Sequence, residues 1–291
     1  MIKVHPLTNK AILSTSIFID WEGKRILVDA GPGCTLRMID SGLPISKVDL
    51  VLISHAHVDH FWDLVPMLWF KSVKGLRRRV KIVGPEPDKA LFDWLMEVSQ
   101  GKDFCEFTGL SAGQRIEFNG LYVEAFGVQH ETSRNALGFV IAEKPRKKLD
   151  TQLLRRLRVP VECWNGIARG KTLRWCGERI DPERALKTVS RKIVYTGDTG
   201  SAESIVEKAL NADLLIAEAT FISNARSKYE ACHMSVKEAL DIAAKAKVKR
   251  ILLTHHSLRY PFEKFVEEVN ALTKPQGPFR VHLGLEPFEV D

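Results

Sequence analysis

The sequence predicts an α/β fold in which strands and helices alternate along most of the chain. Apolar runs of strand length recur, and segments with helical spacing separate several of them, which is typical of α/β layers rather than an all-β barrel. Strand after strand also ends at a histidine, aspartate or glutamate. With 291 residues, of which 45% are hydrophobic, the chain can bury a substantial core.

The first elements form a predicted hairpin with strands over Ala11 to Asp20 and Arg25 to Asp29, joined by a polar turn. A glycine-rich turn from Asp29 to Gly33 follows, and a short helix is expected from about Thr35 to Ser41. Such a turn lets the backbone approach a neighbouring group closely. Asp29 either braces that neighbour through hydrogen bonds or is a plain turn carboxylate.

The next strand runs directly into a cluster of ligand-type residues, VLISHAHVDH from Val51 to His60. Histidine contributes only 9 of the 291 residues, and three of them fall within these six last positions. Imidazole and carboxylate are the ligands of zinc and similar divalent metals. Alternation places His55 and His57 on one side, whereas Asp59 and His60 point to a neighbouring position, so the segment predicts two ions in one pocket. The apolar run from Phe61 to Phe70 predicts a helix.

The middle of the chain repeats this arrangement. A strand is expected from Val80 to Val83 and a helix from Pro87 to Ser99. Asn119-Gly120 joins two further strands in a predicted hairpin. His130 stands just beyond that hairpin and before the strand Ala136 to Ala142, so we expect it to be a ligand rather than a surface residue.

The last strands deliver further chemistry-bearing residues. Ile193 to Thr196 leads to Asp198, Leu214 to Ala217 leads to Glu218, and Ile251 to Thr254 leads to His255 and His256. His233 precedes a predicted helix from Ser235 to Lys247.

A basic segment interrupts the strand rhythm. Between Lys144 and Lys192 there are 15 Lys and Arg residues against 5 Asp and Glu, while the remainder of the chain has a slight acidic excess. A concentrated positive stretch is the footprint expected for a polyanion, although such a run can also be a solvated insertion. Trp164 and Trp175 lie among its basic residues, where they would either stack on bases or pack against each other. A basic helix is expected from Asp150 to Arg158.

Composition narrows the class of protein. Five dispersed cysteines without a CxxC pair argue against a disulfide framework and a cysteine zinc finger, so we expect reduced thiols, although Cys163 and Cys176 could face each other across a hairpin. No apolar run is long enough to span a membrane, and the amino terminus does not resemble a secretory signal. A cytoplasmic protein without membrane contact is therefore expected.

Several motifs together resemble the metallo-β-lactamase superfamily: HxHxDH at His55 to His60, the distant His130, YTGDTG around Asp198, and LTHHSLRY at Thr254 to Tyr260. Within it, the AEATF, HMS and HHSLRY motifs that begin at Ala217, His233 and His255 resemble ribonuclease Z, the tRNA 3′-processing endonuclease. The resemblance covers roughly Ile26 to Tyr260. It implies a four-layer αββα sandwich over residues 1–291 with an inserted basic arm at 144–192, and a homodimer.

The resemblance also implies two zinc ions per chain. His55, His57 and His130 would hold one ion, and Asp59, His60 and His255 the other, with Asp198 bridging. The family's ligand directly follows Leu-Thr, which selects His255 over His256. The same ligands accept Mn²⁺ or Fe²⁺.

A mechanism follows from this ligand set. Water shared by two zinc ions loses a proton near neutral pH and would attack phosphorus in line, and the leaving 3′ oxygen needs a proton. Glu218 can orient and charge the His233 imidazole, which would act as general acid. The expected catalytic residues are Asp59, Glu218 and His233.

The basic segment lies where ribonuclease Z carries its tRNA-binding arm. Its glycine-proline-rich tip is replaced here by residues 159–166, and the family's glycine-rich amino-terminal opening is also missing. Precursor tRNA is nevertheless the expected partner. The expected substrate-binding residues are Arg155, Arg156, Arg158, Trp164, Arg169, Lys171, Arg174 and Arg259.

Two other functions remain open from the sequence. A small-molecule metallohydrolase, such as a cyclic phosphodiesterase or a lactonase, could use the same dinuclear site without needing a basic arm. A nucleic-acid-binding protein with a structural metal site would leave Glu218 and His233 without a task.

Overall fold

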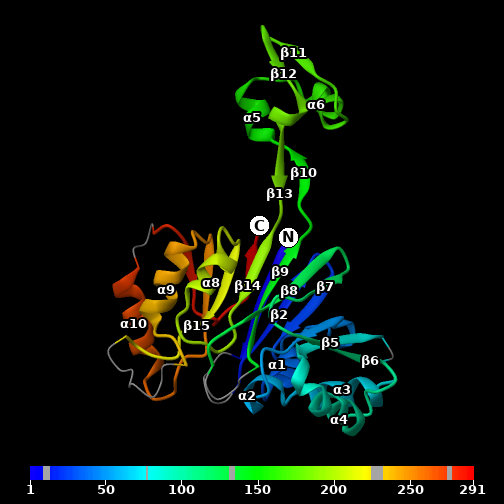
Figure 1. Ribbon diagram of the computed structural model, residues 1–291, viewed down its shortest axis with the longest axis vertical. Coiled ribbons are helices and arrows are strands. Elements are labelled where there is room, and N and C mark those ends of the chain that lie inside the picture. Colours follow the sequence, from blue (N-terminus) through cyan, green and yellow to red (C-terminus); the bar gives the residue numbers. More distant parts are fainter. Residues whose placement is uncertain (9–13, 77, 131–134, 224–231, 274–276) are drawn as a thin grey trace. The chain divides into compact units, whose positions relative to one another are not determined.

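The computed structural model describes residues 1–8, 14–76, 78–130, 135–223, 232–273 and 277–291 (Figure 1). These residues divide into two compact units. Unit 1 comprises Met1–Ile141 and Lys192–Asp291, and unit 2 comprises Ala142–Arg191.

Unit 1 contains two seven-stranded sheets. In the first sheet, β3 to β6 run parallel to one another. Its strands, in spatial order, are β18 (Phe288–Val290), β1 (Ile2–Thr8), β2 (Ser16–Trp21), β3 (Lys24–Val28), β4 (Leu50–Leu52), β5 (Val80–Pro85) and β6 (Cys105–Leu110).

The second sheet is also mixed, and β14 to β17 are its parallel strands. Its strands, in spatial order, are β17 (Arg280–His282), β16 (Arg250–Thr254), β15 (Leu214–Glu218), β14 (Lys192–Tyr195), β9 (Leu137–Glu143), β8 (Leu121–Gly127) and β7 (Arg115–Phe118).

The two sheets face each other across a common core, as the alternation of side chains along each strand requires. Leu50 and Leu52 of β4 belong to the buried cluster that also contains Phe139 and Leu252 of the second sheet. Val51, between them, packs instead against the helices on the outer side. Strand β4 therefore contributes apolar residues to two cores.

Helices cover both outer faces, which gives the predicted four layers (Figure 1). Next to the first sheet lie α1 (Cys34–Asp40), α2 (Val58–Phe61), α3 (Leu64–Val73) and α4 (Lys89–Val98). Next to the second sheet lie α8 (Glu203–Ala209), α9 (Val236–Lys245) and α10 (Phe262–Leu272).

Some boundaries differ from those that the sequence predicts. The helix expected from Phe61 to Phe70 is two helices, α2 and α3, separated around Asp63. Asp63 uses its carboxylate to accept hydrogen bonds from the backbone N–H of Gly33, at 3.1 Å, and of Thr35, at 2.6 Å, and so anchors the start of α1. Part of the predicted strand from Ala11 to Asp20 lies outside the described residues.

Unit 2 has a small core of its own, built from Leu154, Val159, Ile167, Ile180 and Ala185. Strands β10 (Arg146–Leu149) and β13 (Leu186–Val189) pair antiparallel at its base. Its other elements are α5 (Thr151–Arg156), α6 (Val161–Ala168), the hairpin of β11 (Leu173–Trp175) and β12 (Glu178–Ile180), and α7 (Pro182–Ala185).

No helix in the described part of the chain is both long and apolar enough to cross a membrane.

Candidate metal centre

Six of the predicted site residues lie at or just beyond the carboxyl ends of strands. Three of these strands are the parallel strands β14, β15 and β16. Since the carboxyl ends of parallel strands meet at one edge of a sheet, residues far apart in sequence converge there. Asp198 and His255 follow β14 and β16, Glu218 is the last residue of β15, and His55 and His57 follow β4. His130 follows β8 and completes the convergence.

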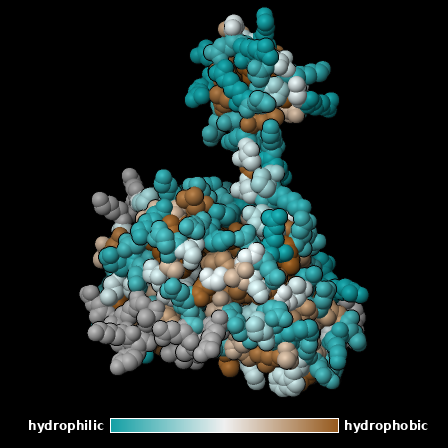
Figure 2. Space-filling model, viewed as in Figure 1, coloured by the Kyte–Doolittle hydropathy of each residue, from teal (hydrophilic) through white to brown (hydrophobic). Residues whose placement is uncertain are grey.

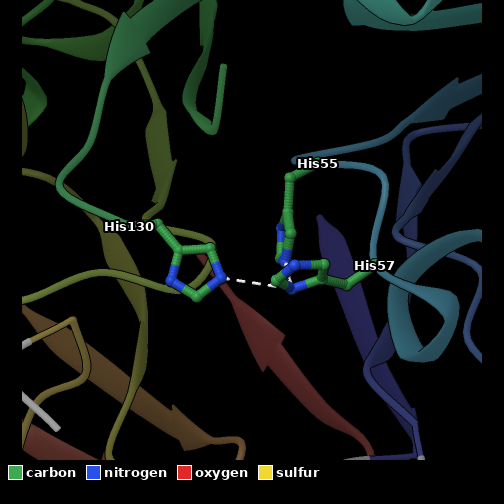
Figure 3. A group of neighbouring side chains, drawn as sticks. All are labelled: His55, His57 and His130. Carbon is green, nitrogen blue, oxygen red and sulfur yellow. Dashed lines mark hydrogen bonds between the residues drawn. The ribbon is translucent and has the colours of Figure 1, made fainter. Parts of the chain in front are cut away.

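Three histidines form the first ligand group (Figure 3). His55 Nε2 lies 2.9 Å from His57 Nδ1, and His130 Nε2 lies 3.2 Å from the same atom. With metal–nitrogen bonds of about 2.0–2.1 Å, tetrahedral geometry places ligand nitrogens roughly 3.3 Å apart. The observed spacing is therefore close to the spacing that a single small divalent ion needs.

Asp59, His60, Asp198 and His255 form the second group, and their ligand atoms all lie within 4.8 Å of one another. His60 Nε2 is 3.3 Å from Asp198 Oδ2, and His255 Nε2 is 3.2 Å from the same oxygen. His60 Nε2 is buried without a hydrogen-bond partner in the described structure. A buried, unpartnered nitrogen beside two carboxylates is suited to bind a cation.

Asp198 lies between the two groups. Its Oδ2 atom, which faces His60 and His255, is also 4.0 Å from His55 Nε2. The side chain is almost completely buried. This position suits a carboxylate that is shared by two ions.

The charges within the site follow the ligand chemistry. Burial is the main cause that lowers the pKa of His55, His57 and His130, so these rings favour the neutral form that binds metal. Burial also disfavours charge on His60, but Asp198 and Asp29 outweigh it and raise the pKa of that imidazole well above its ordinary value. A metal ion would replace the His60 proton.

Hydrogen bonds behind the ligands orient two rings. His60 Nδ1 donates to Asp29 Oδ2 at 2.6 Å, and His55 Nδ1 lies 2.9 Å from Ser54 Oγ, which itself donates to Asp29. The Tyr195 hydroxyl donates to Asp29 as well. The Nε2 atoms of both histidines therefore face the cluster.

Gly31 in the glycine-rich turn packs against the metal loop. A Cβ atom at Gly31 would lie 2.0 Å from the carbonyl oxygen of Asp59. The same oxygen accepts a hydrogen bond from Thr15 N at 2.9 Å, and Ala30 N donates to His60 O at 2.6 Å. The close approach that the glycines predict is therefore present.

His255 and His256 point in different directions. His255 Nε2 faces Asp59 and Asp198, whereas the ring of His256 packs against Phe262 and Phe265. The backbone of His255 has the left-handed conformation, with φ 60°. Of these two residues, the geometry brings His255 into the ligand group.

Glu218 and His233 form a pair beside the second group. His233 Nδ1 lies 2.9 Å from Glu218 Oε1, and Glu218 also accepts hydrogen bonds from Thr199 N at 2.6 Å and from Thr220 Oγ1 at 2.6 Å. Burial opposes a charged His233, but the adjacent Glu218 carboxylate outweighs it and raises the pKa of His233 to about 9. The imidazole therefore carries a proton at neutral pH, as a general acid must.

Three orienting residues were not singled out from the sequence: Ser54, Tyr195 and Thr220. Thr220 Oγ1 lies 2.9 Å from His255 Nδ1 and connects that ring to Glu218. Each of the three stands within three residues of a predicted ligand or catalytic residue, which is the signal that could have identified them.

The predicted substrate-binding residues lie mainly in unit 2. Arg155, Arg156 and Arg158 at the end of α5 are exposed, as are Arg169, Lys171 and Arg174. Arg259 belongs to unit 1, where its guanidinium lies 5.7 Å from the centre of the Phe221 ring.

The two tryptophans of unit 2 pack against its core. The Trp164 indole N–H donates to the carbonyl oxygen of Val159 at 3.1 Å, and Trp175 also contacts the core. The two rings therefore have a structural role in the core of unit 2, although among the described ring contacts none joins them to each other. Cys163 and Cys176 are free thiols, as expected.

The chain is similar to several known proteins. A family model described as beta-lactamase superfamily domain matches residues 24–149 and 152–256. A ribonuclease Z from Archaeoglobus fulgidus is 32% identical over 255 residues, which cover 85% of this chain and 82% of that protein.

Two solved structures share the fold at 20% sequence identity. The metallo-β-lactamase fold protein YhfI from Bacillus subtilis has a TM-score of 0.71 and is covered over 100% of its chain, with 99% of this chain matched. The short form of human tRNase Z has a TM-score of 0.67, with 99% of each chain covered.

Proposed function

The chain belongs to the ribonuclease Z family of the β-lactamase superfamily, and from this premise we propose that it is a metal-dependent endoribonuclease that removes 3′ trailers from precursor tRNA. The observation that carries the proposal is the position of the Glu218–His233 pair beside two adjoining ligand groups. His233 stacks on the ring of His255, with ring centres 5.3 Å apart, and His233 is held by Glu218.

Two zinc ions per chain are the proposed cofactors. His55, His57 and His130 would hold one ion, Asp59, His60 and His255 the other, and Asp198 would bridge them. When bound, two divalent ions supply an activated water molecule at neutral pH and offset charge on the phosphoryl oxygens. The all-nitrogen group and the mixed nitrogen and oxygen group both suit zinc, although Mn²⁺ and Fe²⁺ prefer similar ligands.

The protein's own residues supply orientation and a proton. Asp59 is a proposed catalytic residue because its carboxylate, 3.4 Å from His255 Nε2, would help to hold the second ion. Glu218 fixes the His233 ring and stabilises its charged form. His233 then donates a proton to the departing 3′ oxygen of the tRNA, which would otherwise leave as a poor alkoxide.

Residues 144–192 are proposed as an RNA-binding arm inserted into a single catalytic domain of residues 1–291. The cations Arg155, Arg156, Arg158, Arg169, Lys171 and Arg174 would contact phosphates of the precursor. Trp164, which is half-buried, would contact the RNA beside these cations, and Arg259 would contact the RNA near His233.

A homodimer located in the cytoplasm is also proposed. The outer surfaces of α3 and α4 expose Trp69, Val73, Trp94 and Val98, each with about half of its surface accessible. Figure 2 shows apolar side chains gathered at the lower edge of the molecule, over α2 and α4. An apolar surface of this kind suits pairing with a second copy, which sedimentation of the Trp69→Asp and Trp94→Asp variants would test.

The function is tested with zinc-loaded protein and a 3′-extended precursor tRNA, followed by mapping of the cut. A discrete cut that leaves a 3′ hydroxyl on the tRNA is expected. Hydrolysis of bis(p-nitrophenyl) phosphate without any cut in the precursor would instead indicate a small-molecule hydrolase. RNA binding without hydrolysis of either substrate would indicate a structural metal site.

A further inference from the structure

Cys232 lies beside the proposed general acid, and the mechanism gives it no role. Its Sγ atom and one ring nitrogen each of His130 and His233 lie within 4.8 Å of one another. His130 is buried, and the other two residues are half-buried. These three side chains form a further ligand group, which shares His130 with the first group of the proposed catalytic centre.

The donor set differs from that of the two catalytic groups. One sulfur and two imidazole nitrogens are the ligands that zinc and cadmium accept readily, whereas carboxylates and imidazoles alone also suit harder ions. In a tetrahedral site, sulfur and nitrogen ligands lie roughly 3.6 Å apart, given bonds of about 2.3 and 2.0 Å. The three ligand atoms lie within 4.8 Å of one another, so an ion would require only a small approach of these side chains.

We propose that Cys232, His130 and His233 form an inhibitory site for a thiophilic divalent ion such as Cd²⁺, which would compete with the first catalytic ion for His130. On binding, the Cys232 thiol releases its proton to solvent and the thiolate sulfur ligates the ion. His233 also releases its ring proton to solvent, gives the freed nitrogen to the ion, and so has no proton to donate to the leaving oxygen. The inhibition rests on the proposed function, in which His233 is the general acid. Binding of the ion does not depend on that role.

Spectroscopy tests the site independently of activity. The metal-free protein is titrated with Co²⁺, because a thiolate ligand gives cobalt a charge-transfer absorption band in the near ultraviolet that imidazole and carboxylate ligands do not give. The wild-type protein and the Cys176→Ser control, which alters an exposed thiol of unit 2, should both develop the band. The Cys232→Ser variant should not. Identical spectra for all three proteins would overturn the proposal.

Inhibition is measured on the zinc-loaded enzyme with precursor tRNA and added Cd²⁺. Loss of an outer hydrogen-bond partner already costs about 10- to 100-fold in metal affinity, so loss of the thiolate should raise the half-inhibitory Cd²⁺ concentration at least tenfold. Without added metal, Cys232→Ser should cleave at the wild-type rate. A cobalt band that depends on Cys232 would support the metal site. If cleavage were nevertheless unaltered by Cd²⁺, inhibition at this site would be excluded and His233 would not be the general acid.

Discussion

Asp29 Oδ2 accepts a hydrogen bond of 2.6 Å from His60 Nδ1, and this contact determines which nitrogen of His60 faces the second ligand group. Asp29 is completely buried, and its backbone has the left-handed conformation, with φ 53°. Ser54 and Tyr195 complete its hydrogen bonding. A carboxylate in this position fixes the tautomer of a ligating imidazole and increases its basicity.

Replacing Asp29 by Asn should weaken metal binding. The amide preserves the volume of the side chain but not the charge, so His60 loses the partner that orients it, and affinity should fall about 10- to 100-fold. Metal retained after dialysis against a graded series of chelator concentrations measures the effect. Asp40→Asn makes the same change on an exposed position of α1 and should bind as the wild type does. Equal retention by both variants would contradict the orienting role of Asp29.

His255 and His256 offer a matched pair of substitutions. His255→Ala removes a proposed ligand and should reduce the metal content of the second group. His256→Ala removes a ring that packs on Phe262 and Phe265, so it should lower thermal stability and keep the metal. Elemental analysis of the folded fraction of each variant decides between them. Metal loss in His256→Ala alone would reverse the ligand assignment.

His233→Ala should slow RNA cleavage and leave the two catalytic ions bound. General acid catalysis typically contributes about 10²- to 10⁴-fold, so cleavage of precursor tRNA should fall by that factor. Hydrolysis of bis(p-nitrophenyl) phosphate should fall far less, because p-nitrophenolate leaves without a proton. His5→Ala, on β1 and packed against Phe18, is the control. An equal loss on both substrates would favour a role in binding or metal ligation instead.

The layers of the fold were predictable because several strands are apolar runs that end at a polar motif. Val51 illustrates this, since the buried strand β4 leads directly to His55. Strand β1 was not predicted, because Pro6 interrupts its alternation and removes a backbone donor. Helix α10 has apolar residues at Phe262, Phe265 and Val269, a helical spacing that could have been recognised.

The ligand types could be predicted, but the contacts behind them could not. Motif spacing brings His55, His57 and His60 together locally, whereas Tyr195 reaches Asp29 across 166 positions only because two sheets face each other. Cys232 and His130 likewise meet only in three dimensions. Sequence patterns describe each strand by itself, and the pairing of the sheets determines which strand ends meet.

Removal of the arm should separate RNA cleavage from phosphodiester chemistry. Leu149 and Leu186 are direct partners in the β10–β13 pair, so Asn-Gly can replace residues 150–185 and close the shortened hairpin as a two-residue turn. Cleavage of precursor tRNA should be lost, while hydrolysis of bis(p-nitrophenyl) phosphate and zinc content should remain at the wild-type level. Undiminished tRNA cleavage would show that unit 2 is not a substrate-binding arm.

The arm contains both paired and unpaired cations, which allows a sharper test of phosphate contacts. Arg179 and Arg184 form ion pairs with Asp181, at 2.9 Å, and with Glu178, at 3.1 Å, and Lys187 lies 3.7 Å from Asp150. In the described structure, no ion pair involves the exposed side chains of Arg155, Arg156 and Arg158. The unpaired set is therefore expected to provide more of the phosphate contacts.

Replacing Arg155, Arg156 and Arg158 together by Gln should flatten the salt dependence of tRNA binding. Each phosphate contact contributes about 0.7–0.9 to the slope of log affinity against log salt concentration, so the slope should shrink by roughly two to three. Gln at Arg179, Arg184 and Lys187 removes the same total charge but only cations that already have partners, and the slope should change by less than about one. Binding isotherms over a range of salt concentrations give both values. Equal changes in the two variants would mean that unit 2 acts through its overall charge and that α5 contains no specific phosphate contacts.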